Sequence, residues 1–165
     1  MSWNTYANRG MALEQIIELS NKQYESKGQA VIQKVPTPVK VLKAQRNGRI
    51  IGFWENKSTV DFIGVCKNTA VAFDAKQTKG KSLPFKNIAR HQLEFMLKWY
   101  KQGHEAFILV YFTDLDRCFR LDILNIIEFK KTNTRKSIPL KYFEERGIEV
   151  KKGKGIVLDY LKGIA

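Results

Sequence analysis

Two aspartates stand near one end of a predicted β-hairpin, where acidic side chains are costly unless they take part in chemistry. Asp61 and Asp74 belong to two apolar runs, 60–66 and 70–75, which are joined by a short polar turn at 67–68. Two β-like runs around such a turn are typical of a hairpin. The sequence therefore predicts that the chain doubles back here and brings the two carboxylates together.

The register of this hairpin follows from the length of its turn. If the turn has two residues, partners across the hairpin have positions that add to the same total. Asp61 then lies opposite Asp74, and Thr59 lies opposite Lys76. Because side chains alternate along a strand, all four project from one face at one end of the hairpin. A three-residue turn would shift the register and separate them.

This set of side chains suggests phosphodiester chemistry. Facing carboxylates repel each other and need a cation or a proton between them. Carboxylate and hydroxyl oxygens are hard ligands, which favour Mg²⁺, or alternatively Mn²⁺, over zinc. The metal can lower the pKa of a bound water, and the Lys76 ammonium can stabilise negative charge at phosphorus. The alternative is that Asp61 and Asp74 only end their strands and that Lys76 is a solvated neighbour.

The composition favours one domain that binds a polyanion. The chain has 165 residues, 44% hydrophobic and 12% aromatic, so we assign 1–165 to a single domain. Its formal net charge is +13, and the segments 26–54 and 75–93 contain several Lys or Arg and no acid. Clustered positive charge favours nucleic acid over a surface that is basic only for solubility.

Other classes of site and compartment are disfavoured. Cys66 and Cys118 lie in apolar contexts without CxxC spacing, so we expect them to be buried and reduced. Two His and two Cys are too few for a structural zinc site. No apolar run is long enough to span a membrane, and residues 1–8 lack a signal-peptide core. We therefore expect a soluble, cytoplasmic protein.

The first element that could position the acids is an amphipathic helix over 11–27, which Gly28 ends. Glu14 lies on a flank of this helix near its start. It is either a catalytic acid or a glutamate that the helix dipole favours.

A basic arm follows the first helix. The runs 39–45 and 50–55 flank an Asn-Gly turn, which is a strong hairpin signal, and Pro36 interrupts the strand predicted over 30–35. The arm could contact DNA phosphates, or its lysines could protect an edge hairpin from aggregation. The candidate DNA contacts here are Lys34, Lys40, Lys43, Arg46 and Arg49.

A loop over 77–86 and a helix over 88–102 follow the hairpin of the two aspartates, with Asn87 as the predicted N-cap. Gln92 falls one turn into this helix, where its amide could reach a metal or remain solvated. The candidate phosphate contacts of this segment are Lys79, Lys81, Lys86 and Arg90.

The C-terminal part adds further elements to the same sheet. A basic loop at 130–136 and a basic turn at 151–155 separate some of them. Helices on both sides of strands predict an α/β fold with a central mixed sheet. The predicted elements are strands at 106–112, 118–121 and 156–158 and a helix at 139–146, with Pro139 in its first turn.

Several motifs together resemble a known nuclease family. Asp61 followed by Asp74-Ala75-Lys76 resembles the short D…(D/E)xK motif of restriction-endonuclease-like nucleases. From about Arg9 to about Tyr160, the chain is more specifically similar to the RecU family of Holliday-junction resolvases of Gram-positive bacteria and their phages. The similarity is carried by Arg9-Gly10, Pro36-Thr37-Pro38-Val39, Ser58-Thr59-Val60-Asp61 with Gly64-Val65, Phe73-Asp74-Ala75-Lys76-Gln77-Thr78-Lys79, Leu83-Pro84-Phe85-Lys86-Asn87 and His91-Gln92.

The resemblance implies a restriction-endonuclease-like core with a protruding basic β-hairpin, the stalk, at about 35–53. It implies that Lys76 stabilises the transition state, and it makes Glu14 a further catalytic candidate. It also implies a homodimer that acts on a four-way junction, because such a junction must be cut on two symmetry-related strands. The implied Mg²⁺ ligands are Thr59, Asp61, Asp74 and Gln92.

Two departures from the family pattern are visible. The family usually has Glu where this chain has Asp74. The shorter side chain can move the metal or change the preference between Mg²⁺ and Mn²⁺. The N-terminal extension common in bacterial members is almost absent, which leaves interaction with a recombinase open and favours a phage-encoded member.

We therefore expect a metal-dependent, structure-selective endodeoxyribonuclease of DNA recombination and repair. It would nick four-way junctions symmetrically and leave ligatable 5′-phosphate ends, in a bacterial cell or a phage-infected host. One rival hypothesis is a sequence-specific or damage-specific nuclease of the same fold, since fold does not determine substrate. The other is a DNA-binding recombination accessory that does not cut.

Overall fold

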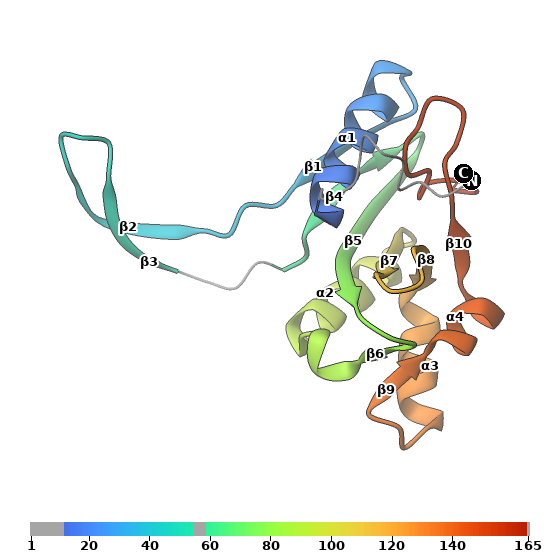
Figure 1. Cartoon of the computed structure of the whole chain (residues 1–165). Coiled ribbons are helices and arrows are strands. Elements are labelled where there is room, and N and C mark those ends of the chain that lie inside the picture. Colours follow the sequence, from blue (N-terminus) through green and yellow to red (C-terminus); the bar gives the residue numbers. More distant parts are fainter. Residues whose placement is uncertain (1–11, 55–58, 165) are drawn as a thin grey trace.

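The computed structural model describes residues 12–54 and 59–164, in which a six-stranded sheet is flanked by helices and a two-stranded arm extends away from it (Figure 1). The predicted mixed sheet with helices on its faces and a protruding hairpin is therefore confirmed. The elements are α1 (Leu13–Ser26), β1 (Ala30–Lys34), β2 (Val39–Ala44), β3 (Ile50–Trp54), β4 (Phe62–Cys66), β5 (Thr69–Thr78), β6 (Ser82–Pro84), the 3-10 turn η2 (Phe85–Asn87), α2 (Arg90–Lys101), β7 (Glu105–Phe112), β8 (Arg117–Asp122), α3 (Ile123–Thr132), β9 (Ser137–Pro139), α4 (Leu140–Arg146) and β10 (Ile148–Val150).

The strands of the large sheet lie in the order β1-β4-β5-β7-β8-β10. β5 and β7 are parallel, and the other neighbouring pairs are antiparallel. A parallel pair needs a crossover connection, which β6, η2 and α2 provide here. This crossover leads the chain back past the second half of β5, where Asp74 and Lys76 lie.

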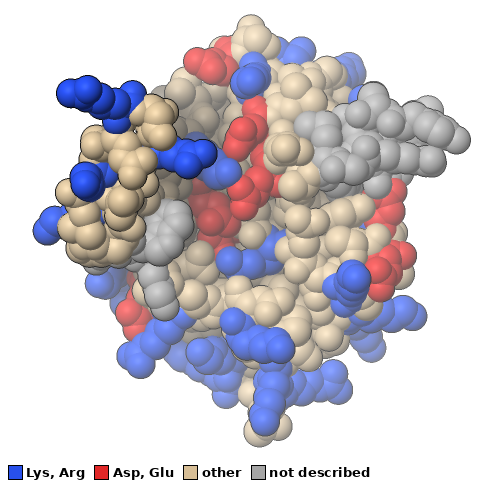
Figure 2. All heavy atoms as spheres, turned by 60° about the vertical axis from the view of Figure 1, so that its left-hand side comes forward, with Lys and Arg blue, Asp and Glu red and all other residues tan. Residues whose placement is uncertain are grey.

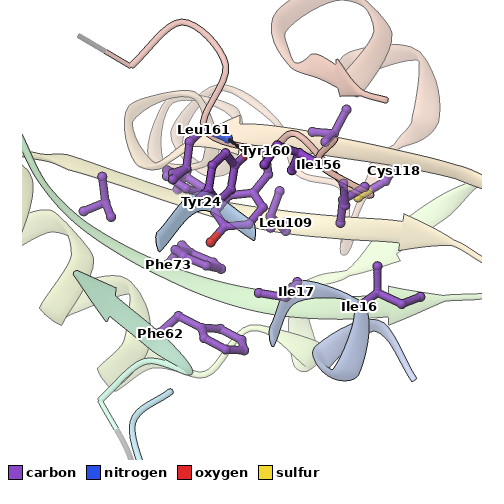
Figure 3. Packing of buried hydrophobic residues seen from close by; sticks show 14 of the residues in the cluster. Ile16, Ile17, Tyr24, Phe62, Phe73, Leu109, Cys118, Ile156, Tyr160 and Leu161 are labelled. Carbon is purple, nitrogen blue, oxygen red and sulfur yellow. Dashed lines mark hydrogen bonds between the residues drawn. The ribbon is translucent and has the colours of Figure 1, made fainter. Parts of the chain in front are cut away.

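Side chains on the two faces of the sheet form separate cores. On one face, α1 and the segment 156–164 pack over the central strands (Figure 3). The ring of Phe73 stacks between those of Phe62 and Phe107, at centroid distances of 5.0 and 4.9 Å, and lies against Tyr160. The opposite face is covered by α2, α3 and α4, where Met96 is fully buried. The strands between these layers are apolar because both of their faces are covered.

The hairpin of β4 and β5, which we call the site hairpin, has the predicted register. Its turn has two residues at 67–68, with Lys67 in the left-handed region at φ 54°. Cys66 pairs with Thr69, and the ladder continues to Phe62 opposite Phe73. β5 extends beyond the predicted end at residue 75, because its second half pairs with β7.

The stalk consists of β2 and β3, which pair with each other and with no strand of the large sheet. Every residue of β2 is exposed, and the register shifts at a bulge between Val41 and Lys43. Gly48 has a φ of 80°, which only glycine adopts freely and which the predicted Asn-Gly turn requires.

The starts of two helices and one short strand were also predicted wrongly. α2 begins after Ala89, not after Asn87, because residues 85–87 form the 3-10 turn η2. Pro139 is the last residue of β9 and precedes α4, and its ring lies outside the helix. The strand predicted at 156–158 is an isolated bridge between Gly153 and Ile156.

α3, β6, β9 and β10 were not predicted at all. Apolar residues of α3 lie on its exposed as well as its buried side, Leu124 among them, so its sequence shows little helical periodicity, and the three strands have three residues each. These short segments are held as strands by their partners: β6 and β9 pair with each other, and β10 pairs with β8. Met11 and Glu55, at the ends of predicted elements, lie outside the described residues.

Cys66 and Cys118 are free and buried, as predicted. Within the two described ranges, none of the helices combines the length and the apolar character needed to cross a membrane.

Candidate active site

The candidate site lies where the open end of the site hairpin meets the first turn of α2. β5 contributes Asp74 and Lys76, the residue before β4 contributes Asp61, and α2 contributes Gln92. Gln92 is the third residue of α2, where its side-chain oxygen accepts a hydrogen bond from the Ala89 N–H at 3.2 Å. This contact caps α2 and holds the glutamine side chain towards β5.

Asp61 takes its position from backbone groups on both sides. Its carbonyl oxygen accepts a hydrogen bond from the Val35 N–H at 2.8 Å, which continues the pairing of β1 with β4. Its side-chain Oδ2 accepts from the Ala75 N–H at 2.9 Å. The carboxylate thus replaces the backbone partner that Ala75 would have in a longer ladder, and it is held beside Asp74.

Asp74 is completely buried, with 0% of its surface exposed. Its Oδ1 accepts a hydrogen bond from Nε2 of Gln92 at 2.8 Å. Its Oδ2 forms an ion pair with the Lys76 ammonium but accepts no hydrogen bond. Burial, followed by the negative charge of Asp61, raises the pKa of Asp74 to about 7, although the Lys76 charge opposes this rise.

Lys76 connects the acid to the helix. Its ammonium lies 3.3 Å from Oε1 of Gln92 and contacts Asp74, while 17% of its side chain remains open to solvent. A buried carboxylate with one oxygen free of hydrogen bonds, next to a second carboxylate, can accept a cation. The ammonium at the solvent side can meet an anionic substrate.

The donor set fits a hard divalent cation better than zinc. Asp61 and Asp74 supply carboxylate oxygens, and one of these, Oδ2 of Asp74, is buried without a hydrogen bond. Residues 12–54 and 59–164 contain no group of three or more His, Cys, Asp or Glu that could hold a metal. A cation held here would therefore need oxygens from amide, hydroxyl, water or substrate in addition to the two carboxylates.

A comparison with models of protein families identifies the family of this chain. The family model described as recombination protein U matches residues 8–165. This chain belongs to the RecU family.

Curated relatives cover nearly the whole of this RecU-family chain. A protein of Limosilactobacillus fermentum is 37% identical over 170 residues, with 98% of this chain and 81% of the relative covered. One of Streptococcus suis is 36% identical over 164 residues, covering 95% and 80%. One of Shouchella clausii is 37% identical over 166 residues, covering 96% and 80%. Each of these relatives is named Holliday junction resolvase RecU.

A solved structure is also similar to this RecU-family chain. It is Hjc of Archaeoglobus fulgidus, described as a Holliday junction resolvase from an archaeal hyperthermophile. The TM-score is 0.49 at 14% identity, and 82% of this chain and 90% of that chain are covered.

The described contacts bring together four of the predicted site residues in this RecU-family chain: Asp61, Asp74, Lys76 and Gln92. Thr59 is exposed, next to residues outside the described ranges, and the β4–β5 ladder ends before reaching it. Its predicted pairing opposite Lys76 is therefore not part of the ladder. Its role as a ligand stays a prediction.

Glu14 contacts a different partner. Its carboxylate pairs with the ammonium of Lys34 at 2.6 Å, and Glu18 lies 3.4 Å from the same ammonium. These contacts connect α1 to the end of β1, the strand that precedes the stalk. They raise the pKa of Lys34. A catalytic role for Glu14 stays a prediction. Lys34, at the end of β1, is engaged by acids, whereas within residues 12–54 and 59–164 no acid pairs with the four predicted DNA contacts on the stalk.

The remaining predicted DNA contacts are exposed. Figure 2 shows Lys and Arg side chains on the arm at the left and along the lower edge of this face, with Asp and Glu side chains near its centre. The stalk carries Lys40, Lys43, Arg46 and Arg49, and the segment after β5 carries Lys79, Lys81, Lys86 and Arg90. Among the latter, Arg90 pairs with Glu94 at 2.6 Å.

The hydrogen bond from the Ala75 N–H to Asp61 was not predicted from the sequence. No pattern of side chains shows which backbone N–H lacks a partner in the strand ladder.

Proposed function

We propose that this RecU-family chain is a metal-dependent, structure-selective endodeoxyribonuclease that resolves four-way DNA junctions. The observation that carries this proposal is the completely buried Asp74 carboxylate, which pairs with the Lys76 ammonium and lies next to the negative charge of Asp61. Relatives over nearly the full chain are named Holliday junction resolvases, which supports the choice of substrate.

Mg²⁺, with Mn²⁺ as a substitute, is the cofactor that the oxygen donors favour. When bound, such a cation supplies neutralisation of phosphate charge and a lower pKa for a coordinated water. Asp61 and Asp74 are the proposed carboxylate ligands, and Thr59 is the proposed hydroxyl ligand.

The protein side chains have separate tasks in the proposed reaction. Asp74 must lose its proton to hold a cation, and the Gln92 amide keeps its Oδ1 aligned by the 2.8 Å hydrogen bond. The Ala75 N–H keeps the carboxylate of Asp61 in place. Lys76, released from Oδ2 of Asp74, would turn its ammonium to the non-bridging oxygens of the scissile phosphate.

The hydrogen bonds that Gln92 makes in the structure compete with its proposed role as a metal ligand. Its Oε1 accepts hydrogen bonds from Ala89 and from Lys76, and its Nε2 is directed to Asp74. Binding a cation through Oε1 would require rotation of the amide and loss of these contacts. We therefore propose that Gln92 positions Asp74 and Lys76 before the cation binds and becomes a ligand only after that rotation.

The junction is the proposed substrate because the stalk is a basic hairpin that projects from the body beside the acidic centre (Figures 1 and 2). We propose a homodimer, since two symmetric nicks need two copies of the site. A water molecule would attack the scissile phosphorus and displace the 3′ oxygen, which takes up a proton, so each nick would carry a 3′-hydroxyl and a ligatable 5′-phosphate. We place this activity in the cytoplasm of a bacterium or a phage-infected host, because the named relatives are bacterial.

The test is a cleavage assay with a labelled synthetic four-way junction and a linear duplex of matching sequence. Symmetric nicks that require Mg²⁺ or Mn²⁺, disappear in EDTA and disappear in Asp74→Asn support the proposal. Equal cutting of the linear duplex would favour a sequence-specific or damage-specific nuclease. Tight binding of the junction without product at any metal concentration would favour a non-cleaving accessory.

A further inference from the structure

A second basic segment, far from the site residues in sequence, lies beside the segment that leads into α2. Residues 130–136 run from the end of α3 to β9 and contain four cations and no acid. All four side chains are exposed. They are Lys130, Lys131, Arg135 and Lys136.

Backbone pairing holds this segment against the basic segment 79–90. β6 and β9 form an antiparallel pair with Leu83 opposite Ile138. The Phe85 N–H donates to the carbonyl of Lys136 at 3.0 Å, and the Leu140 N–H donates to the carbonyl of Lys81 at 2.9 Å. These contacts place the two basic segments on one continuous surface, which we call the basic ledge.

Side chains join the two halves of the ledge as well. The ring of Phe85 lies 6.2 Å from that of Phe129, and the Lys130 ammonium lies over the Phe85 ring at 6.0 Å from its centroid. At the end of α3, the Asn133 N–H donates to the Phe129 carbonyl at 3.0 Å. Hydrogen bonds therefore hold the backbone of the ledge in place, and its long cationic side chains extend from that backbone.

The ledge leads directly to the candidate site. Its middle part, η2, is followed within three residues by α2, whose Gln92 donates to Asp74. In Figure 1, β6, β9 and the end of α3 lie together on the same side of α2. In Figure 2, Lys and Arg side chains gather along the edge of the face that has the acids at its centre.

The charge of the ledge is largely uncompensated. Segments 79–90 and 130–136 contribute four cations each, and for these eight side chains the described residues provide one ion pair, between Arg90 and Glu94. Exposed cations along an open surface suit an extended polyanion better than a small anion, which would need a concave pocket. Duplex DNA, with closely spaced phosphates on both strands, has this form.

We propose that residues 130–136 form the second half of a phosphate-binding surface, and that the basic ledge holds one duplex arm as its strand enters the site. This inference rests on the proposed function for the nature of the substrate. The segment contacts phosphates and not base edges, so it contributes affinity for any sequence and for linear duplex as well as for a junction.

The test compares two variants of equal net charge in the full-length protein. The ledge variant is Lys130→Gln, Lys131→Gln, Arg135→Gln and Lys136→Gln. The control variant is Lys27→Gln, Lys152→Gln, Lys154→Gln and Lys162→Gln, which removes four exposed lysines at or near a cavity of about 780 Å³ beside the turn of the site hairpin. That cavity is at the opposite end of the hairpin from Asp74, because Lys67 of the turn lines it.

Binding of the junction and of the linear duplex is measured in EDTA at several salt concentrations, after thermal melting has shown that both variants fold. We expect the ledge variant to bind both DNAs at least about tenfold more weakly. We expect its plot of log K against log salt to be shallower by about 3 to 4, since each lost phosphate contact removes about 0.9. The control variant should keep most of the wild-type affinity and slope.

Equal losses in the two variants would overturn the inference, because the effect would then come from net charge alone. Wild-type affinity in a folded ledge variant would overturn it too, and would leave a different polyanion, such as an acidic protein surface, as the partner of the ledge. A wild-type protein that cuts no junction while the ledge variant loses DNA affinity would contradict the proposed function and support the inference.

Discussion

The two hairpins of this protein have similar signals in the sequence and opposite environments in the structure. The site hairpin lies inside the sheet, with Phe62, Val71 and Phe73 at 0% exposure. The stalk is exposed along all of β2, and Leu42 at its bulge is 66% exposed. One hairpin is held by packing on both faces, and the other is held by its own hydrogen bonds and turn.

This difference explains which hairpin can carry a catalytic site. A register slip of one residue in the site hairpin would move Phe73 out of its stack and move Asp74 to the wrong face of the sheet. In the stalk, a bulge between Val41 and Lys43 displaces no core residue. Burial therefore selects one geometry for the acids, whereas the stalk accommodates a bulge without a change in either core.

The largest expected effect is on catalysis, at the buried hairpin. Asp74→Asn and Lys76→Ala should each reduce junction cleavage by about a thousandfold or more, because they remove a ligand oxygen or the charge that stabilises phosphorus. Lys40→Ala on the stalk should change binding and leave the single-turnover cleavage rate of bound junction nearly unchanged. Single-turnover rates with saturating enzyme separate the two outcomes. Cleavage by Asp74→Asn at a tenth of the wild-type rate would contradict the assigned role.

The second effect contrasts stability in the two hairpins. Phe73→Ala should lower the free energy of unfolding by about 3 to 5 kcal/mol, because it leaves a cavity between two stacked rings. Phe53→Ala, at a position 49% exposed on the stalk, should change it by less than about 0.5 kcal/mol. Urea unfolding followed by circular dichroism measures both values. Similar losses in the two variants would show that the stalk packs on the body more than the structure indicates.

The third effect concerns substrate choice. Replacing Val39 to Phe53 by a short Gly-Ser linker should reduce the preference for a junction over a linear duplex by about tenfold or more, with little change in melting temperature, since the removed strands contribute nothing to either core. Competition binding between the two DNAs gives the ratio. An unchanged ratio in the folded deletion protein would remove the stalk from junction recognition.

The most gradual expected effect is a pH dependence of stability caused by Asp74. Burial and the charge of Asp61 raise its pKa from 3.8 to about 7, so the folded state binds the proton more tightly than the unfolded state. The stabilising contribution is complete below about pH 4, is lost as the pH rises to about 7, and is constant above that. The slope contributed by this group is at most about 1.4 kcal/mol per pH unit.

Asp74→Asn provides the matched control for this prediction, because other titrating groups cancel in the difference. In EDTA, the stability of the wild type relative to Asp74→Asn should fall between about pH 4 and pH 7. Adding Mg²⁺ should favour the wild type increasingly as the pH approaches 7, because the cation competes with the proton. Parallel stability curves for the two proteins without metal would show that Asp74 titrates normally.

Much of the site hairpin could be predicted from the sequence because its determinants are local. A two-residue turn and the alternation of apolar residues set which side chains share a face, and the structure confirms the register from Cys66–Thr69 to Phe62–Phe73. The Asn-Gly turn identified the stalk for the same reason. The family motif added the prediction that Gln92 shares a metal with the acids. The structure shows Gln92 hydrogen-bonded to Asp74, and its role as a ligand stays a prediction.

The rest depended on contacts between distant segments. The ladder between β4 and β5 stops at Phe62, and beyond it the Ala75 N–H donates to the Asp61 side chain, while the Asp61 carbonyl continues the pairing with β1 by accepting from Val35. No local pattern shows that Lys34 is engaged by Glu14 and Glu18. The pairing of β6 with β9 joins two basic segments. Each of these strands has only three residues, which is too short a pattern to be recognised from the sequence.

The sequence by itself determined which residues alternate onto one face of the site hairpin, since a strand has a period of two and the turn sets the register. Only the tertiary structure decided how deeply Asp74 is buried, which backbone group binds Asp61, and which nearby cations form ion pairs with acids. Burial and charge neighbours depend on how layers pack and how remote strands pair, and these are properties of the whole chain.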